Sequence, residues 1–343
     1  MPYRRAVDAL VVAWAAAVVV SAQQARETGA PSDPVAAVLT EARALIDAGK
    51  PAAAIEKLRT HGEPADLRVA ALLGVAFYHA NDAARAIATL QPVLMRLPPG
   101  SAERREVVQV LGLSHYLAGH ITESIPYLEE IRATVPGDVK LGYALGMAYA
   151  QTRQPAKARE SIARTFNLPP DSPAAHLLTG QMMNRLELED LAEAELRQVT
   201  LQEPKLPEAH YLLAQIAVFR SRFEEGLDLL RAELAINPAH AMAMYLMGDI
   251  YSRQAKWNDA ITALQRSIWI NPYFSGPYIL LGKAYTRTAQ PGPAEEMLRR
   301  AVQYDPNNKT AHYLLGQLLQ QTGRPEEARR ELAIAERFQG AIK

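Results

Sequence analysis

The sequence predicts an all-α fold, a right-handed α-solenoid built from about nine helix–turn–helix units. Three observations predict it: a glycine recurs at multiples of 34 residues, a proline follows 24 positions after each of these places except the last, and a small and an aliphatic residue stand at fixed places between them. The recurring glycines are Gly112, Gly146, Gly180, Gly248, Gly282 and Gly316, with Ala214 in the one remaining place, and an earlier glycine, Gly74, keeps the same distance to its proline, Pro98. A fixed period of this length is typical of stacked supersecondary units, each packing only on its neighbours.

The first helix of each unit carries the glycine. Apolar residues around it fall at i, i+4 and i+7, as in Met244, Gly248 and Tyr251. This spacing is the stripe of an amphipathic helix. Runs that alternate polar and apolar residues are scarce, so we expect no β-sheet.

The second helix carries the small and the aliphatic residue, 12 and 16 positions after the glycine. The small residues are Ala86, Ser124, Ala158, Ala192, Gly226, Ala260, Ala294 and Ala328. The aliphatic residues are Leu90, Leu128, Ile162, Leu196, Leu230, Leu264, Leu298 and Leu332. Because protein interiors are close-packed, a small residue indicates where two helices cross closely. The proline then ends the second helix.

The repeat array is expected to cover residues 35–343, with units that start near residues 35, 67, 105, 139, 173, 207, 241, 275 and 309. Asp33 and Pro34 suit the N-cap and the first position of the first helix. Ala42 stands where the first unit should have its glycine. Residues 101–104 are an insertion between two units, and we expect a local break in the stacking there.

These offsets resemble the tetratricopeptide repeat, a helix–turn–helix unit of the same length. The best match is residues 275–308, through Tyr278, Leu281, Gly282, Tyr285, Ala294, Leu298, Ala301 and Pro306. The resemblance implies a binding scaffold whose first helices line a concave groove. The family's best-known peptide clamp uses a lysine three positions before the glycine and an asparagine one position after it. No unit here has that pair, so recognition of chaperone C-termini is not expected.

The N-terminal segment predicts a destination outside the cytoplasm. Arg4 and Arg5 precede an apolar run over residues 9–20, which is shorter than the roughly 20 residues of a membrane span. Small residues at Val20 to Ala22 suit cleavage before Gln23, so residues 1–22 are interpreted as a secretory signal peptide and residues 23–34 as a flexible lead-in. The expected location is periplasmic or secreted, and the alternative is an uncleaved N-terminal membrane anchor. The chain has no cysteine, which excludes disulfides and a lipid-modified cysteine.

The sequence offers no catalytic motif, and the repeats leave no stretch for a catalytic domain. We therefore expect a protein that is not an enzyme and has no cofactor. His176, His210 and His312 share the position four residues before the glycine, which permits a metal-binding ladder. Met244 and Tyr278 hold the same position in sister units, and this favours packing.

The charged residues predict a solvated outer surface. Lysine and arginine together number 37, as do aspartate and glutamate, so nucleic acid is not expected as a partner. Carboxylates such as Glu193–Glu195, Glu224–Glu225 and Glu326–Glu327 are expected to face solvent.

The candidate binding site lies beside the glycines, at offsets −3, +1 and +5 on the first helices, where the units differ most. Its residues are Tyr211, Gln215, Tyr245, Asp249, Arg253, Lys283, Arg287, Tyr313, Gln317 and Gln321. Tyrosine and arginine are typical of protein–protein hot spots, and guanidinium groups can hold an extended peptide. The alternative is that Asp249 and Arg253 form an ordinary surface pair and that the tyrosines only pack adjacent helices. Toward the N-terminus, Val75, Leu113 and Met147 predict an apolar continuation.

The function these observations favour is a non-catalytic scaffold of the cell envelope that binds a partner protein or peptide in the groove. The alternative is an accessory subunit of an envelope enzyme or export complex, serving glycosyl transfer, polysaccharide export or a peptidase. The oligomeric state is left open.

Overall fold

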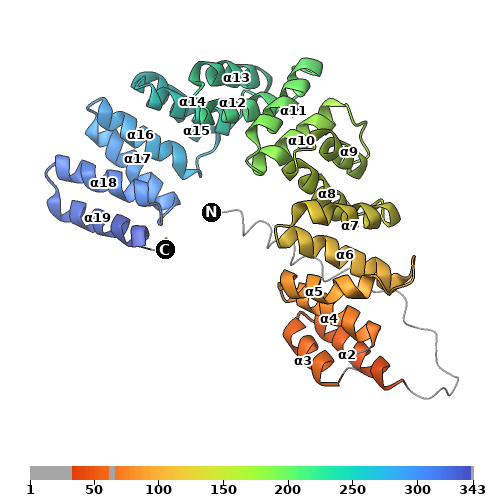
Figure 1. Ribbon diagram of the computed structural model, residues 1–343. Coiled ribbons are helices and arrows are strands. Elements are labelled where there is room, and N and C mark those ends of the chain that lie inside the picture. Colours follow the sequence, from red (N-terminus) through yellow and green to blue (C-terminus); the bar gives the residue numbers. More distant parts are fainter. Residues whose placement is uncertain (1–32, 62–65, 341–343) are drawn as a thin grey trace. The chain divides into compact units, whose positions relative to one another are not determined.

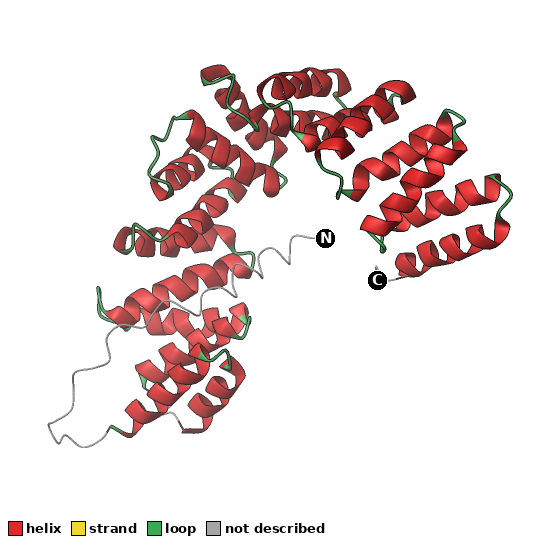
Figure 2. Cartoon of the chain, turned by 180° about the vertical axis from the view of Figure 1, so that it is seen from behind, coloured by secondary structure: helices red, strands yellow, loops and turns green. Residues whose placement is uncertain are grey.

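The part of the chain that the structure describes is entirely helical. A computed structural model describes residues 33–61 and 66–340, which form eighteen helices in nine consecutive pairs (Figures 1 and 2). The predicted all-α class and the pairing of helices are confirmed. The expected signal peptide, residues 1–22, lies outside the described residues.

The helices fall into two compact units, Met1–Pro170 and Asp171–Lys343. The first unit holds α2 (Pro34–Asp47), α3 (Pro51–His61), α4 (Leu67–His79), α5 (Ala83–Leu94), α6 (Ala102–Leu117), α7 (Ile121–Thr134), α8 (Val139–Gln151) and α9 (Pro155–Thr165). The second holds α10 (Pro173–Arg185), α11 (Glu189–Gln202), α12 (Ala209–Phe219), α13 (Phe223–Ile236), α14 (Ala241–Arg253), α15 (Trp257–Ile270), α16 (Ser275–Arg287), α17 (Pro291–Tyr304), α18 (Lys309–Gln321) and α19 (Pro325–Gly340).

In the seven pairs that have a repeat glycine, this glycine lies directly against the aliphatic residue of the second helix. A Cβ atom built on Gly248 would stand 2.4 Å from Cγ of Leu264, and one built on Gly282 would stand 2.4 Å from Cγ of Leu298. Real Cβ atoms essentially never approach that closely. The two leucines are buried, as is Ala260 of the small-residue row. Glycine is therefore needed for space, because a side chain at this point would push the two helices apart.

The turn inside each pair contains one residue in the left-handed backbone conformation, seven positions after the glycine position. These residues are Gly49, Asn81, Gly119, Arg153, Glu187, Ser221, Ala255, Ala289 and Gly323, with φ between 57° and 81°. Only three of them are glycine, although glycine is the residue that adopts this conformation without steric cost. Packing of the two helices therefore imposes the turn at the other six.

The insertion at residues 101–104 lengthens a helix. The Ser101 hydroxyl accepts a hydrogen bond from the Arg104 backbone N–H, and the helix α6 that starts there is 16 residues long. The Arg104 side chain also donates to the backbone carbonyl of Leu94 at the end of α5, at 3.3 Å. Helix α6 contacts both α4 and α5. The predicted break in the stacking is therefore wrong.

In several pairs, the side chain four residues before the repeat glycine, or before Ala214 in its place, forms a hydrogen bond with the backbone carbonyl of the proline that follows the preceding second helix. The Tyr278 hydroxyl donates to the Pro272 carbonyl, and the His210 ring nitrogen Nε2 lies 2.9 Å from the Pro204 carbonyl. His312 makes the same contact with Pro306. The proline thus ends one helix and also provides an acceptor that aligns the next helix.

His176 and His312, which both hold the position four residues before the repeat glycine, are buried against a carboxylate of the second helix. His176 Nδ1 lies 2.7 Å from Glu195, and His312 Nδ1 lies 2.6 Å from Glu331. Glu195 is buried, which corrects the expectation that it faces solvent. The described residues contain no group of three or more potential metal ligands.

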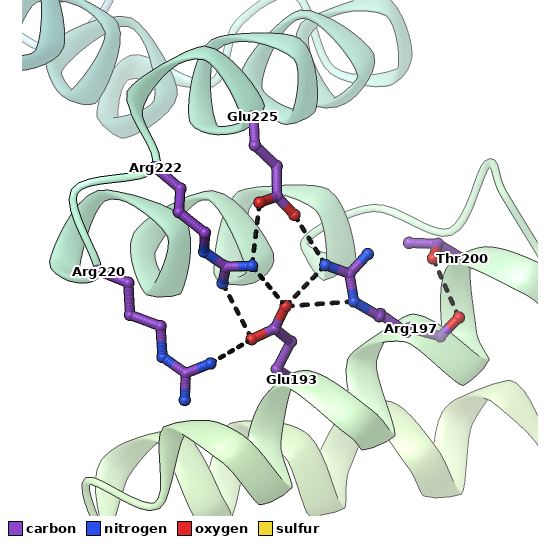
Figure 3. A network of polar contacts seen from close by, with 6 residues as sticks. All are labelled: Glu193, Arg197, Thr200, Arg220, Arg222 and Glu225. Atoms are coloured by element: carbon purple, nitrogen blue, oxygen red, sulfur yellow. Dashed lines mark hydrogen bonds and ion pairs between the residues drawn. The ribbon is translucent and has the colours of Figure 1, made fainter.

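A cluster of charged side chains joins α11 to α13 (Figure 3). Glu193 accepts from Arg197 and Arg220 at 2.7 Å and from both terminal nitrogens of Arg222 at 2.9 and 3.0 Å. Glu225 completes the cluster by binding Arg197 and Arg222. The Glu193 side chain is only 12% exposed, so its expected place on a solvated surface is corrected. The cluster fastens the second helix of one pair to that of the next.

The same cluster recurs 102 residues later, three repeat periods along the chain. Glu295 binds Arg299 of its own helix at 2.8 Å and Arg324 at 2.6 Å, and Glu327 binds both arginines. This recurrence identifies the arrangement as a repeat-to-repeat clamp.

These clamps predict a loss of stability in acid. Burial alone raises the pKa of Glu295, but hydrogen bonds from Arg324 and Arg299 outweigh it and hold the pKa below the usual value. A carboxylate with a lowered pKa in the folded state stabilises the protein above its unfolded pKa, about 4.5, and that contribution is lost as the pH falls below it. Glu295→Gln should therefore be less stable than the wild type at pH 7, with the difference shrinking between about pH 5 and pH 3. Urea unfolding across this range measures the difference, and a gap that is independent of pH contradicts the assignment.

Candidate functional site

The first helices form the inner side of the second unit. Helix α10 contacts α12, α12 contacts α14, α14 contacts α16, and α16 contacts α18, within the second unit. Successive second helices are joined by the charged clamps, but their backbones show no comparable approach in the described residues. Because the first helices lie closer together, the stack bends toward them. We call the exposed side of α10, α12, α14, α16 and α18 the first-helix face, and the candidate residues belong to these helices.

Two of the candidate tyrosines lie in the contact between neighbouring pairs. Tyr211 is 8% exposed, its ring centre is 4.5 Å from that of His240, and its hydroxyl accepts from Gln215. Tyr245 is half-buried and meets the ring of Phe274 edge-on at 5.1 Å. Burial raises the pKa of both tyrosine hydroxyls. These rings pack adjacent pairs, as the alternative interpretation expected.

The candidate residues of α18 are open. Tyr313 is 47% exposed, and its hydroxyl accepts a hydrogen bond from Gln317 at 2.7 Å. Gln317 and Gln321 are exposed as well. A tyrosine ring and two amide side chains are therefore available on this helix.

The cations of the face lie in α14 and α16. Arg253 donates to Asp249 at 2.8 Å, which is the ordinary i,i+4 pair, yet the arginine remains 53% exposed. Lys283 and Arg287 are exposed. The Lys283 ammonium lies 6.0 Å from the ring centre of Trp257, at the outer limit of a cation–π contact.

The structure adds Phe219, which the sequence analysis did not select. It is the last residue of α12, at the offset +5 that holds Arg185, Arg253 and Arg287 in the other pairs, and it is 73% exposed. Within the second unit the other residues of this row are polar, so the sequence signal is one apolar residue among Arg185, Arg253, Arg287 and Gln321.

The expected apolar continuation in the first unit is mostly internal. Val75 is 2% exposed and belongs to the core, and Leu113 and Met147 are half-buried. The Met147 sulfur is 3.8 Å from the Tyr116 hydroxyl. Val75 therefore provides no surface for a partner.

Comparison with known proteins matches this fold. Sequence profiles of the tetratricopeptide repeat match residues 39–102, 143–200 and 275–341, and the profile of anaphase-promoting complex, cyclosome, subunit 3 matches residues 196–267. No curated protein sequence matches the chain. No helix in the described residues combines the length and apolar character of a membrane span.

Solved structures with the same architecture share little sequence with this chain. MamA from Desulfovibrio magneticus is 20% identical, covering 50% of this chain and 97% of its own, with a TM-score of 0.46. YrrB, described as a TPR protein with an unusual peptide-binding site, is 16% identical, covering 55% and 95%, with a TM-score of 0.46. PilW, a type IV pilus biogenesis factor, is 20% identical, covering 57% and 90%, with a TM-score of 0.47.

At these identities the likeness concerns the fold alone, and the sequence profiles carry the assignment. Together they match segments in both units, and each matched segment contains paired helices. The chain belongs to the tetratricopeptide repeat family.

Proposed function

We propose that this protein is a non-catalytic scaffold that binds a segment of a partner protein on the first-helix face of its second unit. One observation carries the proposal: exposed arginines of the first helices share one repeat row, at offset +5, with the exposed Phe219. Arg222 and Arg324, at the start of second helices, are held in clamps between pairs. Arg185 and Arg287, on first helices, are exposed and take part in no ion pair among the described residues.

Protein binding fits this surface better than catalysis. The helix pairs and their short turns take up nearly all of residues 33–61 and 66–340, which leaves little chain there for a catalytic domain. Exposed aromatic residues and arginines are instead the residue types enriched in protein–protein interfaces.

Reversing two charges should abolish partner binding. In Arg253→Glu with Arg287→Glu, like charges would replace cations that a partner uses, and we expect at least a tenfold loss of the captured partner, since like-charge contacts cost several kcal/mol. The matched control is Arg266→Glu with Arg330→Glu, which makes the same change on exposed positions of second helices.

The measurement is affinity capture by the mature chain, with the partner identified by mass spectrometry and its binding then measured with purified proteins. Equal binding by the first-helix variant and the wild type would overturn the proposal. A partner with glycosyl transferase or peptidase activity would assign the chain as an accessory subunit.

We also propose an envelope location. Its support is the pair Arg4 and Arg5, the apolar run over residues 9–20 and the small residues that end at Ala22. N-terminal sequencing of the protein from its native host tests this. A mature chain that starts at Gln23 supports export with cleavage, a membrane-bound chain that retains residues 1–22 supports the uncleaved anchor, and an intact chain in the cytoplasmic fraction contradicts the envelope location.

A further inference from the structure

The first-helix face of the second unit is basic, although the chain as a whole has no net charge. Offsets +1 and +5 on α10, α12, α14, α16 and α18 hold ten residues, of which four are cations and one is a carboxylate. The cations are Arg185, Arg253, Lys283 and Arg287. The carboxylate, Asp249, is bound to Arg253.

Two pairs of carboxylates in the second unit are engaged by arginines between second helices. Glu193 with Glu225, and Glu295 with Glu327, neutralise the arginines of the clamps between second helices. Among the described residues, no carboxylate pairs with Arg185, Lys283 or Arg287. Exposed cations without partners attract a negatively charged ligand.

The order of residues along the face indicates how that ligand is built. At offset +5, four consecutive pairs present Arg185, Phe219, Arg253 and Arg287. Packed helices lie about 8–10 Å apart, and an extended chain advances about 3.3 Å per residue. A segment that crosses the first helices therefore meets one side chain of this row about every three residues.

We propose that the first-helix face binds an extended acidic peptide segment whose carboxylates and one apolar side chain are spaced three residues apart. Carboxylates at the first, seventh and tenth places meet Arg185, Arg253 and Arg287, and an apolar side chain at the fourth place covers Phe219. This inference rests on the proposed function and gives the chemical class of the partner. Arginine suits the role because its guanidinium group holds a carboxylate through two parallel hydrogen bonds.

A single-stranded nucleic acid fits the row less well. Its backbone carries a phosphate at every nucleotide and is followed by closely spaced cations, with successive bases stacked on aromatic rings. Here Phe219 is the one aromatic residue of the row, and Asp249 lies beside Arg253. The row combines three cations with one apolar contact, which the mixed side chains of a peptide can match.

The test uses labelled ten-residue peptides and the whole chain, with binding followed by fluorescence anisotropy. One peptide has glutamate at places one, seven and ten, leucine at place four and serine elsewhere. A second peptide is its reverse, because the direction of binding is open. A third has the same composition with the three glutamates adjacent. We expect one of the spaced peptides to bind at least tenfold more tightly than the third, and to weaken as salt rises because exposed charges are screened.

Variants then assign the contact. Arg185→Gln with Arg287→Gln should weaken the spaced peptide by about fivefold, the effect of losing two exposed ion pairs. Arg266→Gln with Arg330→Gln, on second helices, should leave it unchanged. Equal binding of the spaced and adjacent peptides, an unchanged affinity in the Arg185 and Arg287 variant, or tighter binding of a ten-nucleotide oligothymidine overturns the inference.

Failure of this inference is separable from failure of the proposed function. If neither spaced peptide binds while a captured partner is still lost in Arg253→Glu with Arg287→Glu, the face binds a partner of another class. If a spaced peptide binds but no captured partner depends on the face, the proposed function fails and the charge preference stands.

Discussion

Gly248→Ala is expected to destabilise the protein by about 2 kcal/mol, because the added methyl group overpacks a closed contact. The new Cβ would stand 2.4 Å from Cγ and 2.6 Å from Cδ2 of Leu264, which is fully buried between α14 and α15. Alanine is the better helix former by about 1 kcal/mol, so any net loss of stability comes from the steric contact. Urea unfolding gives the difference in free energy.

Two further variants make this result specific. Leu264→Ala alone should cost about 3 kcal/mol through the cavity it leaves. Combined with Gly248→Ala, it removes the atoms that clash, so the double variant should be more stable than the sum of the two changes by about 1 kcal/mol or more. Gly292→Ala in α17 is the control, since a Cβ on that glycine has nothing within 4 Å, and it should leave stability unchanged or raise it by up to about 1 kcal/mol. Additive effects in the double variant would contradict the close contact.

Glu193→Ala is expected to cost about 2 kcal/mol, because it leaves three guanidinium groups facing one another without their shared carboxylate. Arg197, Arg220 and Arg222 all bind this one side chain, which is 12% exposed. The arginines are 34–48% exposed, so solvent screens them and the cost falls below that of a fully buried pair.

The control for this change is Glu160→Ala, which breaks an exposed i,i+4 pair with Arg164. Its side chain is 58% exposed, and such pairs contribute about 0.5 kcal/mol or less. Thermal and urea unfolding of both variants compare the two positions. Equal losses would show that the cluster around Glu193 acts as an ordinary surface pair.

The helix contacts could be predicted from the sequence because the residues that recur at fixed spacing are the residues that touch between the two helices. The positions of Gly248 and Leu264 hold a small and an aliphatic residue in every unit, because close packing of the two helices limits the size of both side chains. The insertion at residues 101–104 misled the prediction for a physical reason. Four residues are close to one helical turn, so they lengthen α6 while nearly keeping the direction of its buried face.

The candidate site was harder to predict, since exposure depends on the next unit. Tyr211 and Tyr313 occupy the same offset, yet the first is buried and the second is half exposed. Tyr211 packs against a ring 29 residues further along the chain, His240, and Tyr245 packs against Phe274 at the same separation. A pattern within one unit cannot show this neighbour. The clamp at Glu193 was missed likewise, because its partners come from two units.

The left-handed turns imply that substitutions in the turns can change the stability of the array without altering the exposed surfaces of its first or second helices. Six turns hold a residue other than glycine in this conformation, at a cost on the order of 1 kcal/mol each for a residue with a Cβ atom. Ala255 and Ala289 are the plainest cases, since neither has a polar side chain to support the turn. The chain therefore folds with conformational strain spread along its length, and a lineage of such proteins can gain or lose heat tolerance one turn at a time while its binding surface stays the same.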